Sequence, residues 1–202
     1  MDRRTAPSTT RRARTRRPAA TLAAISMVAA VVAGASSIGS AAPSKPDGTT
    51  TPTAPKADRV DRSEPSFSNP TEVDNPLFPI SDLHSAILIG NDEGHLLKIE
   101  TTLLPDPKVI AWKGKRVKTL VSQFVSYLDG RMHEVALDWY AQADDGSVWY
   151  FGEDVFNYED GVVADTNGTW IAGKDGPPGM IMPVDPQLGD AFRPENIPNF
   201  ES

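Results

Sequence analysis

The chain has 202 residues, with 27 Asp and Glu against 20 Lys and Arg and no cysteine. Its negative charge excludes nucleic acid and anionic membrane surfaces as partners, because both repel an acidic protein. Without cysteine there is no disulfide, thiolate metal site or cysteine-linked lipid, so stability has to come from the hydrophobic core.

The first 42 residues have the three-part layout of a secretory signal. Seven of the first 18 residues are arginine, and the following stretch 19–35 is uncharged and rich in alanine. Small residues allow cleavage near Ala35 or at 41–42. The alternative is an uncleaved N-terminal anchor, because a stretch of this length can span a bilayer. The sequence therefore predicts a secreted or extracytoplasmic protein, with an anchor in the cell envelope as its only expected membrane contact.

The next segment, residues 43–66, has the composition of a disordered linker. It is rich in proline and threonine, and Val60 is its only large aliphatic residue. Such a segment buries too little apolar surface to offset the entropy of ordering. Residues 67–202 remain as one domain. Seven basic residues and one acidic residue lie within 1–42, so the rest of the chain keeps 13 basic and 26 acidic residues.

Regular turn signals divide this domain into strands. Asp-Gly pairs occur at 129–130, 145–146, 160–161 and 175–176, and runs rich in Val, Trp, Tyr and Phe lie between the first three. Asp-Gly suits a two-residue hairpin turn. Two more hairpins are expected upstream, from 83–89 with 95–104 and from 109–112 with 117–128.

The run 117–128 is the one ambiguous element. Leu120, Phe124 and Leu128 repeat every four residues, as in a helix, but the many β-branched residues favour a strand. With this strand included, the predicted fold is all-β. We expect an antiparallel meander that forms a barrel or a sandwich.

The hairpin turns also predict which residues face each other across neighbouring strands. A two-residue turn at 145–146 places Asp138 opposite Glu153, Tyr140 opposite Phe151, and Gln142 opposite Trp149. The turn at 160–161 places Trp170 opposite Phe151. The other side of the sheet, which carries Trp139, Ala141 and Tyr150, is the expected core.

This register gathers a candidate binding face from six side chains: Asp138, Tyr140, Trp149, Phe151, Glu153 and Trp170. Two carboxylates directly opposite each other repel unless a cation or a shared proton lies between them. Flat rings beside a carboxylate pair are typical of sites for sugars, cationic small molecules or a divalent ion. The expected function is a non-enzymatic binding domain for a glycan, a small molecule or a divalent cation.

Two other interpretations fit the same residues. The aromatic side chains could form a packed layer, which would make the chain a structural protein of the cell envelope. The carboxylate pair could serve a glycosidase-like hydrolase, because retaining glycosidases hold two carboxyls about 5 to 5.5 Å apart. The familiar hydrolase, nucleotide and metalloprotease motifs are missing, and His84, His95 and His133 lack the spacing of metal ligands. No catalytic residue, metal ligand or cofactor is assigned.

Two stretches of the second half carry a resemblance to a known group of proteins. They are DWYAQ at 138–142 and DGSVWYFGED at 145–154. Later motifs are GTW at 168–170, AG at 172–173, PGMIMP at 178–183, GD at 189–190 and RPE at 193–195. Together they resemble an uncharacterised family of secreted bacterial β-rich proteins, over residues 75–195. The resemblance implies an exported protein without assigned activity. It also implies further strands beyond the segment matching Arg193, which leaves two alternatives for the domain 67–202, a native C-terminus or a truncated one.

Overall fold

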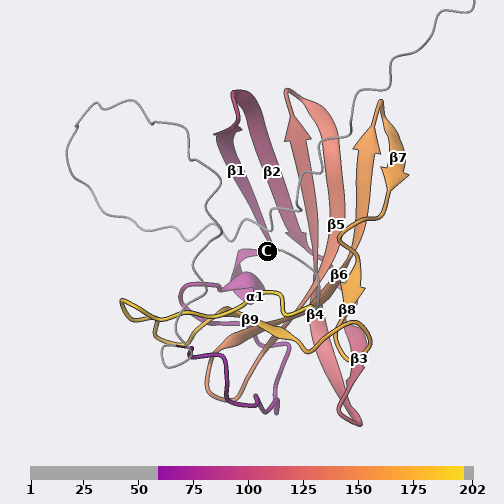
Figure 1. Cartoon of the computed structure of the whole chain (residues 1–202). Helices are drawn as coiled ribbons and strands as arrows, with labels where there is room; N and C mark the ends of the chain where they lie inside the picture. The colour runs from indigo at the N-terminus through magenta and orange to yellow at the C-terminus, as the bar shows by residue number, and fades with distance from the viewer. Residues whose placement is uncertain (1–58, 198–202) are drawn as a thin grey trace, which may run out of the picture.

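The computed structural model describes residues 59–197 (Figure 1). The predicted signal at 1–42, most of the predicted linker and residues 198–202 lie outside the described residues. In chain order the elements are α1 (Ile80–Leu83), β1 (Ser85–Asp92), β2 (His95–Leu103), β3 (Lys108–Trp112), β4 (Lys115–Leu128), β5 (Arg131–Gln142), β6 (Val148–Glu159), β7 (Val162–Asp165), β8 (Trp170–Ile171) and β9 (Gly179–Met182).

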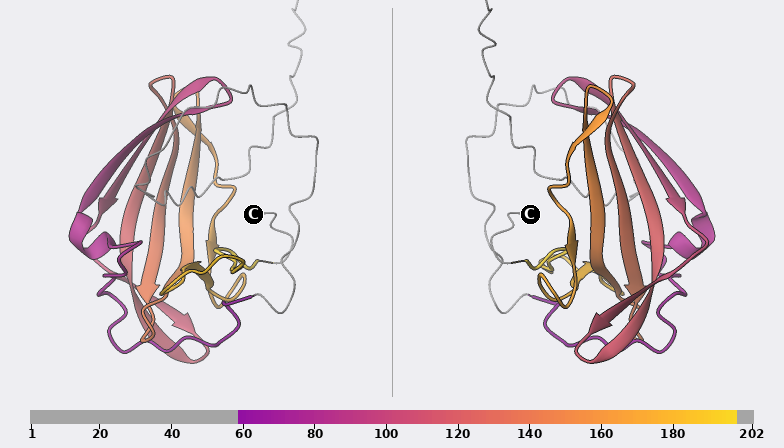
Figure 2. Two further views of the ribbon diagram at one scale, coloured as in Figure 1. Left: turned by 90° about the vertical axis from the view of Figure 1, so that its left-hand side faces the viewer. Right: turned by 90° about the vertical axis from the view of Figure 1, so that its right-hand side faces the viewer.

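All nine strands belong to one antiparallel sheet, so the predicted all-β meander is confirmed. The central order is β1-β2-β4-β5-β6-β7, while β3 pairs with β4, and β8 and β9 pair with β6. The sheet is open, because its outer strands β1 and β7 do not pair with each other in the described structure (Figure 1). The segment that follows β8 lies on one side of this sheet (Figure 2).

Two of the predicted Asp-Gly turns form as two-residue hairpin turns. Leu128 pairs with Arg131 around Asp129-Gly130, and Glu159 pairs with Val162 around Asp160-Gly161. Both residues of each turn have positive φ, as a primed turn requires. The predicted strand 117–128 is also confirmed, since it lies within β4.

The predicted two-residue turn at Asp145-Gly146 is wrong. Gln142 pairs with Val148, so five residues connect β5 to β6. The Asp145 carboxylate accepts hydrogen bonds from the amide and hydroxyl of Ser147, at 2.9 and 2.6 Å. Asp144 is held by Ser66 and Ser68 from far upstream in the chain. These side-chain bonds stabilise a wider loop than the dipeptide alone predicts.

A β-bulge at Gly152 changes the register between β5 and β6. Asp138 pairs with Glu153 but Tyr140 pairs with Tyr150, so one β5 residue faces two residues of β6 at this point. Gly152 has a φ of 120°, and a Cβ there would lie 2.2 Å from the Trp170 carbonyl oxygen. Only glycine allows β8 to approach β6 so closely.

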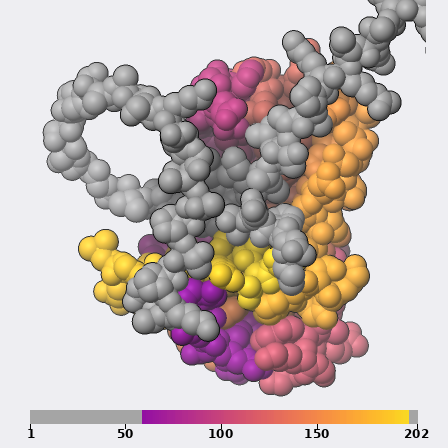
Figure 3. Space-filling view, in the orientation of Figure 1, coloured from indigo at the N-terminus to yellow at the C-terminus, as the bar shows by residue number. Residues whose placement is uncertain are grey.

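The described residues at the two ends of the chain lie side by side (Figure 3). Arg59 and Ala191 form a parallel bridge, and the Val60 amide donates to the Ala191 carbonyl at 3.0 Å. Asp61 accepts a hydrogen bond from the Arg193 amide at 3.0 Å. The last part of the predicted linker, residues 59–66, therefore contacts the domain. Among residues 59–197, no helix is long and apolar enough to cross a membrane.

Candidate functional site

Asp138 of β5 and Glu153 of β6 are directly opposite each other, as the sequence predicts. The prediction succeeds because two register differences cancel. The loop after β5 is wider than a two-residue turn, which shifts the pairing by one, and the bulge at Gly152 shifts it back. Both side chains are buried, with 7% of Asp138 and 2% of Glu153 exposed. The two carboxyl groups therefore lie inside the fold and not on its surface.

Two tyrosines hold the Asp138 carboxylate. The Tyr150 hydroxyl donates to its Oδ1 at 2.7 Å, and the Tyr140 side chain also hydrogen-bonds to it. The two rings are stacked, with centroids 5.0 Å apart and planes inclined by 21°. Tyr140 belongs to the predicted set, whereas the sequence predicts Tyr150 on the opposite side of the sheet. The wider loop before β6 brings Tyr150 opposite Tyr140 and therefore beside Asp138.

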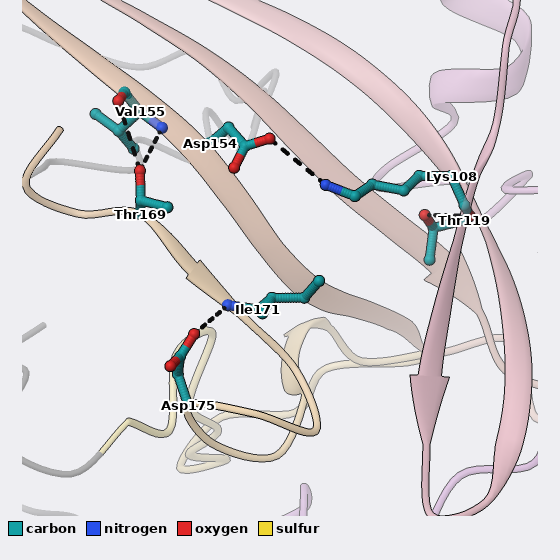
Figure 4. Close-up of polar contacts among 7 residues, drawn as sticks. All are labelled: Lys108, Thr119, Asp154, Val155, Thr169, Ile171 and Asp175. Atoms are coloured by element: carbon teal, nitrogen blue, oxygen red, sulfur yellow. Dashed lines mark hydrogen bonds and ion pairs between the residues drawn. The ribbon is translucent and has the colours of Figure 1, made fainter.

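Trp170 of β8 completes the aromatic part of the site. It pairs with Glu153 across the sheet, and its ring and that of Tyr150 form a T-shaped contact at a centroid distance of 5.4 Å. Polar contacts on both sides fix β8 in place (Figure 4). The Thr169 hydroxyl accepts from the Val155 amide at 2.8 Å, and Asp175 accepts from the Ile171 amide at 2.9 Å.

A third carboxyl, that of Glu195, reaches the pair from the C-terminal segment, which we define as residues 191–197. Glu195 is 6% exposed and raises the pKa of both Asp138 and Glu153. The segment lies against β9, where a Cβ on Gly179 would be 1.9 Å from the Pro194 carbonyl oxygen. The sequence could not have indicated this residue, because its proximity depends on contacts made far along the chain.

Burial and mutual repulsion keep protons on this cluster. Desolvation is the largest cause that raises the pKa of Asp138 to about 7, while the tyrosine hydrogen bonds oppose the rise. Desolvation and the Asp138 charge raise the pKa of Glu153 to about 9. Burial also raises the pKa of Glu134, which adds to the repulsion from its position on β5. At neutral pH, therefore, the pair retains at least one proton.

Two buried polar atoms in this cluster have no hydrogen-bond partner: Glu153 Oε1 and Trp170 Nε1. One is a carboxyl oxygen and the other an N–H donor, and their residues are neighbours across β6 and β8. Leaving such groups unsatisfied destabilises a folded protein by about 1–3 kcal/mol each. Buried polar groups are normally paired, so these two atoms single out the cluster as the candidate site.

The remaining two residues of the predicted set belong to a different part of the core. Phe151 follows Tyr150 and points to the opposite side of the sheet, where its ring contacts Phe67 and Trp112. Trp149 is 5% exposed, and its Nε1 donates to the Ser147 hydroxyl at 2.8 Å. The predicted single face of six residues is therefore wrong.

The individual pairings behind that prediction are corrected with it. Tyr140 faces Tyr150 in place of Phe151, Gln142 faces Val148 in place of Trp149, and Trp170 faces Glu153 in place of Phe151. The first two differences follow from the wider loop after β5. The third follows from the register irregularity between β6 and β7 at Asn157 and Tyr158, and from the connection that precedes β8. The structure brings together four of the six residues: Asp138, Tyr140, Glu153 and Trp170.

The histidines give no metal centre in the described part of the chain. His95 Nδ1 lies 2.7 Å from an Asp129 oxygen on the exposed surface. Within residues 59–197, no group of three or more His, Asp and Glu is arranged to hold a metal ion.

Fold and site together define an all-β protein with a buried cluster of carboxyls and aromatic rings. A comparison of the chain with models of known protein families gives no match, and neither do comparisons with curated proteins or solved structures.

Proposed function

We propose that this chain is an extracytoplasmic, non-enzymatic binding domain whose site is formed by Asp138, Tyr140, Tyr150, Glu153 and Trp170. The observation that carries the proposal is the pair of buried unsatisfied atoms, Glu153 Oε1 and Trp170 Nε1. The extracytoplasmic location rests on the signal-like composition of residues 1–42. The resemblance to secreted β-rich bacterial proteins supports the same location.

The chemistry of the two atoms favours a ligand hydroxyl group, and therefore a sugar or another neutral polyol. A hydroxyl is both an acceptor and a donor, so hydroxyl groups suit the Trp170 N–H and Glu153 Oε1 alike. A cation would satisfy the carboxyl but leave the Trp170 N–H without an acceptor. It would also have to displace the proton that the raised pKa keeps on Glu153. The rings of Tyr150 and Trp170 supply the apolar contact that sugars require.

Access to this site has to involve the C-terminal segment. Glu195 lies close enough to raise the pKa of both carboxyls, and the segment packs on β9 beside the site. The two unsatisfied atoms are inaccessible in the present arrangement. We therefore expect ligand entry to involve displacement of residues 191–197.

The test is a calorimetric and thermal-shift screen of neutral mono- and oligosaccharides, with CaCl2 as the cation arm. We expect one sugar class to raise the melting temperature. Trp170→Phe, which keeps the ring and removes the N–H, should then weaken its binding at least tenfold, on the order of 1.4 kcal/mol or more. Trp149→Phe is the matched control, because the Trp149 N–H already has a partner within the core.

The outcomes separate the candidate functions. Equal sugar binding by the Trp170→Phe variant and the parent protein would contradict the proposed site. A shift with calcium alone would favour the cation alternative. Hydrolysis of a bound oligosaccharide, lost in Asp138→Asn, would favour the glycosidase-like alternative. No response to any ligand would leave a structural envelope protein.

A further inference from the structure

The outer strand β1 has an edge that is open to another strand. Among the described residues it pairs only with β2, over eight residues without a bulge. It contains no Lys, Arg or Pro, which are the residues that usually keep a sheet edge from pairing. The opposite outer strand, β7, is only four residues long and has a register irregularity beside it. The β1 edge is therefore longer and more regular than the β7 edge.

The hairpin with β2 determines which backbone groups of β1 point outward. Asp92 and His95 close a two-residue turn, so Asp92 and every second residue before it exchange hydrogen bonds with β2. The His84 carbonyl fits this alternation, because it accepts from the Leu103 amide at 2.7 Å. The amides and carbonyls that point away from the sheet are those of Ser85, Ile87, Ile89 and Asn91.

The side chains along this edge form an exposed apolar strip. Ile87 is 65% exposed and Ile89 is 74% exposed, and both point to the same side of the sheet. Leu96 of β2 lies on the same side, opposite Asn91, and is 55% exposed. Aliphatic side chains at an unpaired strand edge favour association with another strand.

We propose that β1 is the interface of a symmetric homodimer, in which the β1 strands of two copies pair antiparallel about a two-fold axis at Leu88. In this register Ile87 lies opposite Ile89 of the second copy, and Ser85 lies opposite Asn91. Every residue with outward-pointing backbone groups then meets another such residue. The four isoleucines cluster on one side of the joined sheet, while the two Leu88 side chains meet on the other.

Apolar contact selects this register over its neighbours. With the axis at Leu88, all four isoleucines lie opposite isoleucines. An axis at Ile87 would place Ile89 opposite Ser85, and an axis at Ile89 would place Ile87 opposite Asn91. Either shift sets two of the four isoleucines against polar residues. A head-to-tail pairing of β1 with β7 would give an open filament rather than a closed dimer.

Analytical ultracentrifugation of the full chain tests the proposal. We expect a dimer with a dissociation constant on the order of 10 µM, because a single strand pair buries less than a standard interface. The double variants Ile87→Lys with Ile89→Lys, and Ile87→Glu with Ile89→Glu, should each weaken the dimer at least tenfold. An equimolar mixture of the two should form a heterodimer, which also shows that both variants fold. The control, Val162→Lys with Val163→Lys on the β7 edge, should dimerise like the parent protein.

A single cysteine tests the register. The chain has no cysteine, so Leu88→Cys introduces the only thiol. At the two-fold axis the two Leu88 residues form a non-hydrogen-bonded pair, whose Cα atoms are about 4.5 Å apart and within disulfide reach. Mild oxidation should cross-link Leu88→Cys into a covalent dimer and leave Ile87→Cys mostly uncross-linked. A monomeric parent protein at 200 µM, or equal cross-linking of both variants, would overturn the proposal.

Discussion

Glu153 is the residue at which the site and the stability of the fold are most directly linked. Its folded pKa is raised, so the folded protein keeps a proton that the unfolded chain has already released. Stability therefore falls as pH rises from about 4.5, the unfolded pKa, to about 9, the folded pKa. Ionisation of Asp138 lowers the stability of the fold further between about pH 4 and pH 7. The ionisable neighbours of Glu153 are Glu134, Asp138 and Tyr140 on β5, Tyr150 on β6 and Glu195.

We expect Glu153→Gln to remove most of this pH dependence. Near pH 4 the variant and the parent should unfold alike, because both carry a neutral side chain at position 153. At pH 7 the variant should be more stable by on the order of 3 kcal/mol, since about 2.5 pKa units separate pH 7 from the unfolded pKa. Urea unfolding at several pH values measures the difference. Glu159→Gln, exposed at the end of the same strand, should leave the pH profile unchanged. A constant difference at every pH would contradict the role of Glu153 protonation.

The residues of the site differ in how far the sequence could reveal them. The opposition of Asp138 and Glu153 is predictable, because hairpin registers follow from local turn chemistry. Glu195 is not, since its position depends on how residues 191–197 pack on β9. The position of Tyr150 beside Asp138 is also not predictable, although it depends on a hairpin loop. The loop that shifts its register is held by Ser66 and Ser68, almost eighty residues away in the chain.

At the scale of elements, the proposed ligand entry depends on the C-terminal segment. Gly179 is the point at which this can be tested, because a methyl group there would collide with the backbone at Pro194. Backbone atoms cannot rotate aside as a flexible side chain can, so the segment itself has to shift. A change at Gly179 therefore acts on residues 191–197 and replaces no side chain of the site, although Gly179 is the cross-strand partner of Tyr150.

We expect Gly179→Ala to loosen the segment and to speed sugar entry. Amide exchange at residues 191–193, including the Arg193 amide bonded to Asp61, should accelerate at least tenfold. The overpacking should also destabilise the fold by about 1–3 kcal/mol. Gly90→Ala is the control, because a methyl group at Gly90 meets nothing within 4 Å. If the amide exchange rates at residues 191–193 did not change in Gly179→Ala, the added methyl group would have displaced β9 and not the C-terminal segment.

The strands themselves show why part of the fold is predictable and part is not. β4 and the two-residue turns at its end and at Asp160-Gly161 follow from residues close in sequence. The bulge at Gly152 exists because β8 approaches β6 there, a contact between distant parts of the chain. The openness of the sheet is likewise a long-range property. An alternating strand pattern is the same whether the outer strands meet or remain apart.

For the whole molecule, net charge decides how two copies approach each other. After residues 1–42 the chain carries 26 acidic and 13 basic residues, so two copies repel at long range. The β1 edge itself carries a single charged residue, Asp92. Association through this edge therefore works against the overall charge. The overall charge would instead favour association through the basic β3–β4 hairpin, because this hairpin would be attracted to an acidic second copy. Its basic residues are Lys113, Lys115, Arg116 and Lys118.

Ionic strength separates these two modes of association. The Debye length falls from about 30 Å at 0.01 M salt to about 8 Å at 0.15 M, so added salt screens the repulsion between acidic copies. We expect the dimer dissociation constant to fall several-fold over this range, measured by sedimentation at pH 8, where free histidine is largely neutral. Weaker association at higher salt would instead indicate that the basic hairpin binds the acidic surface. In that case Lys115→Ala with Lys118→Ala would abolish association, and substitutions at Ile87 and Ile89 would leave it intact.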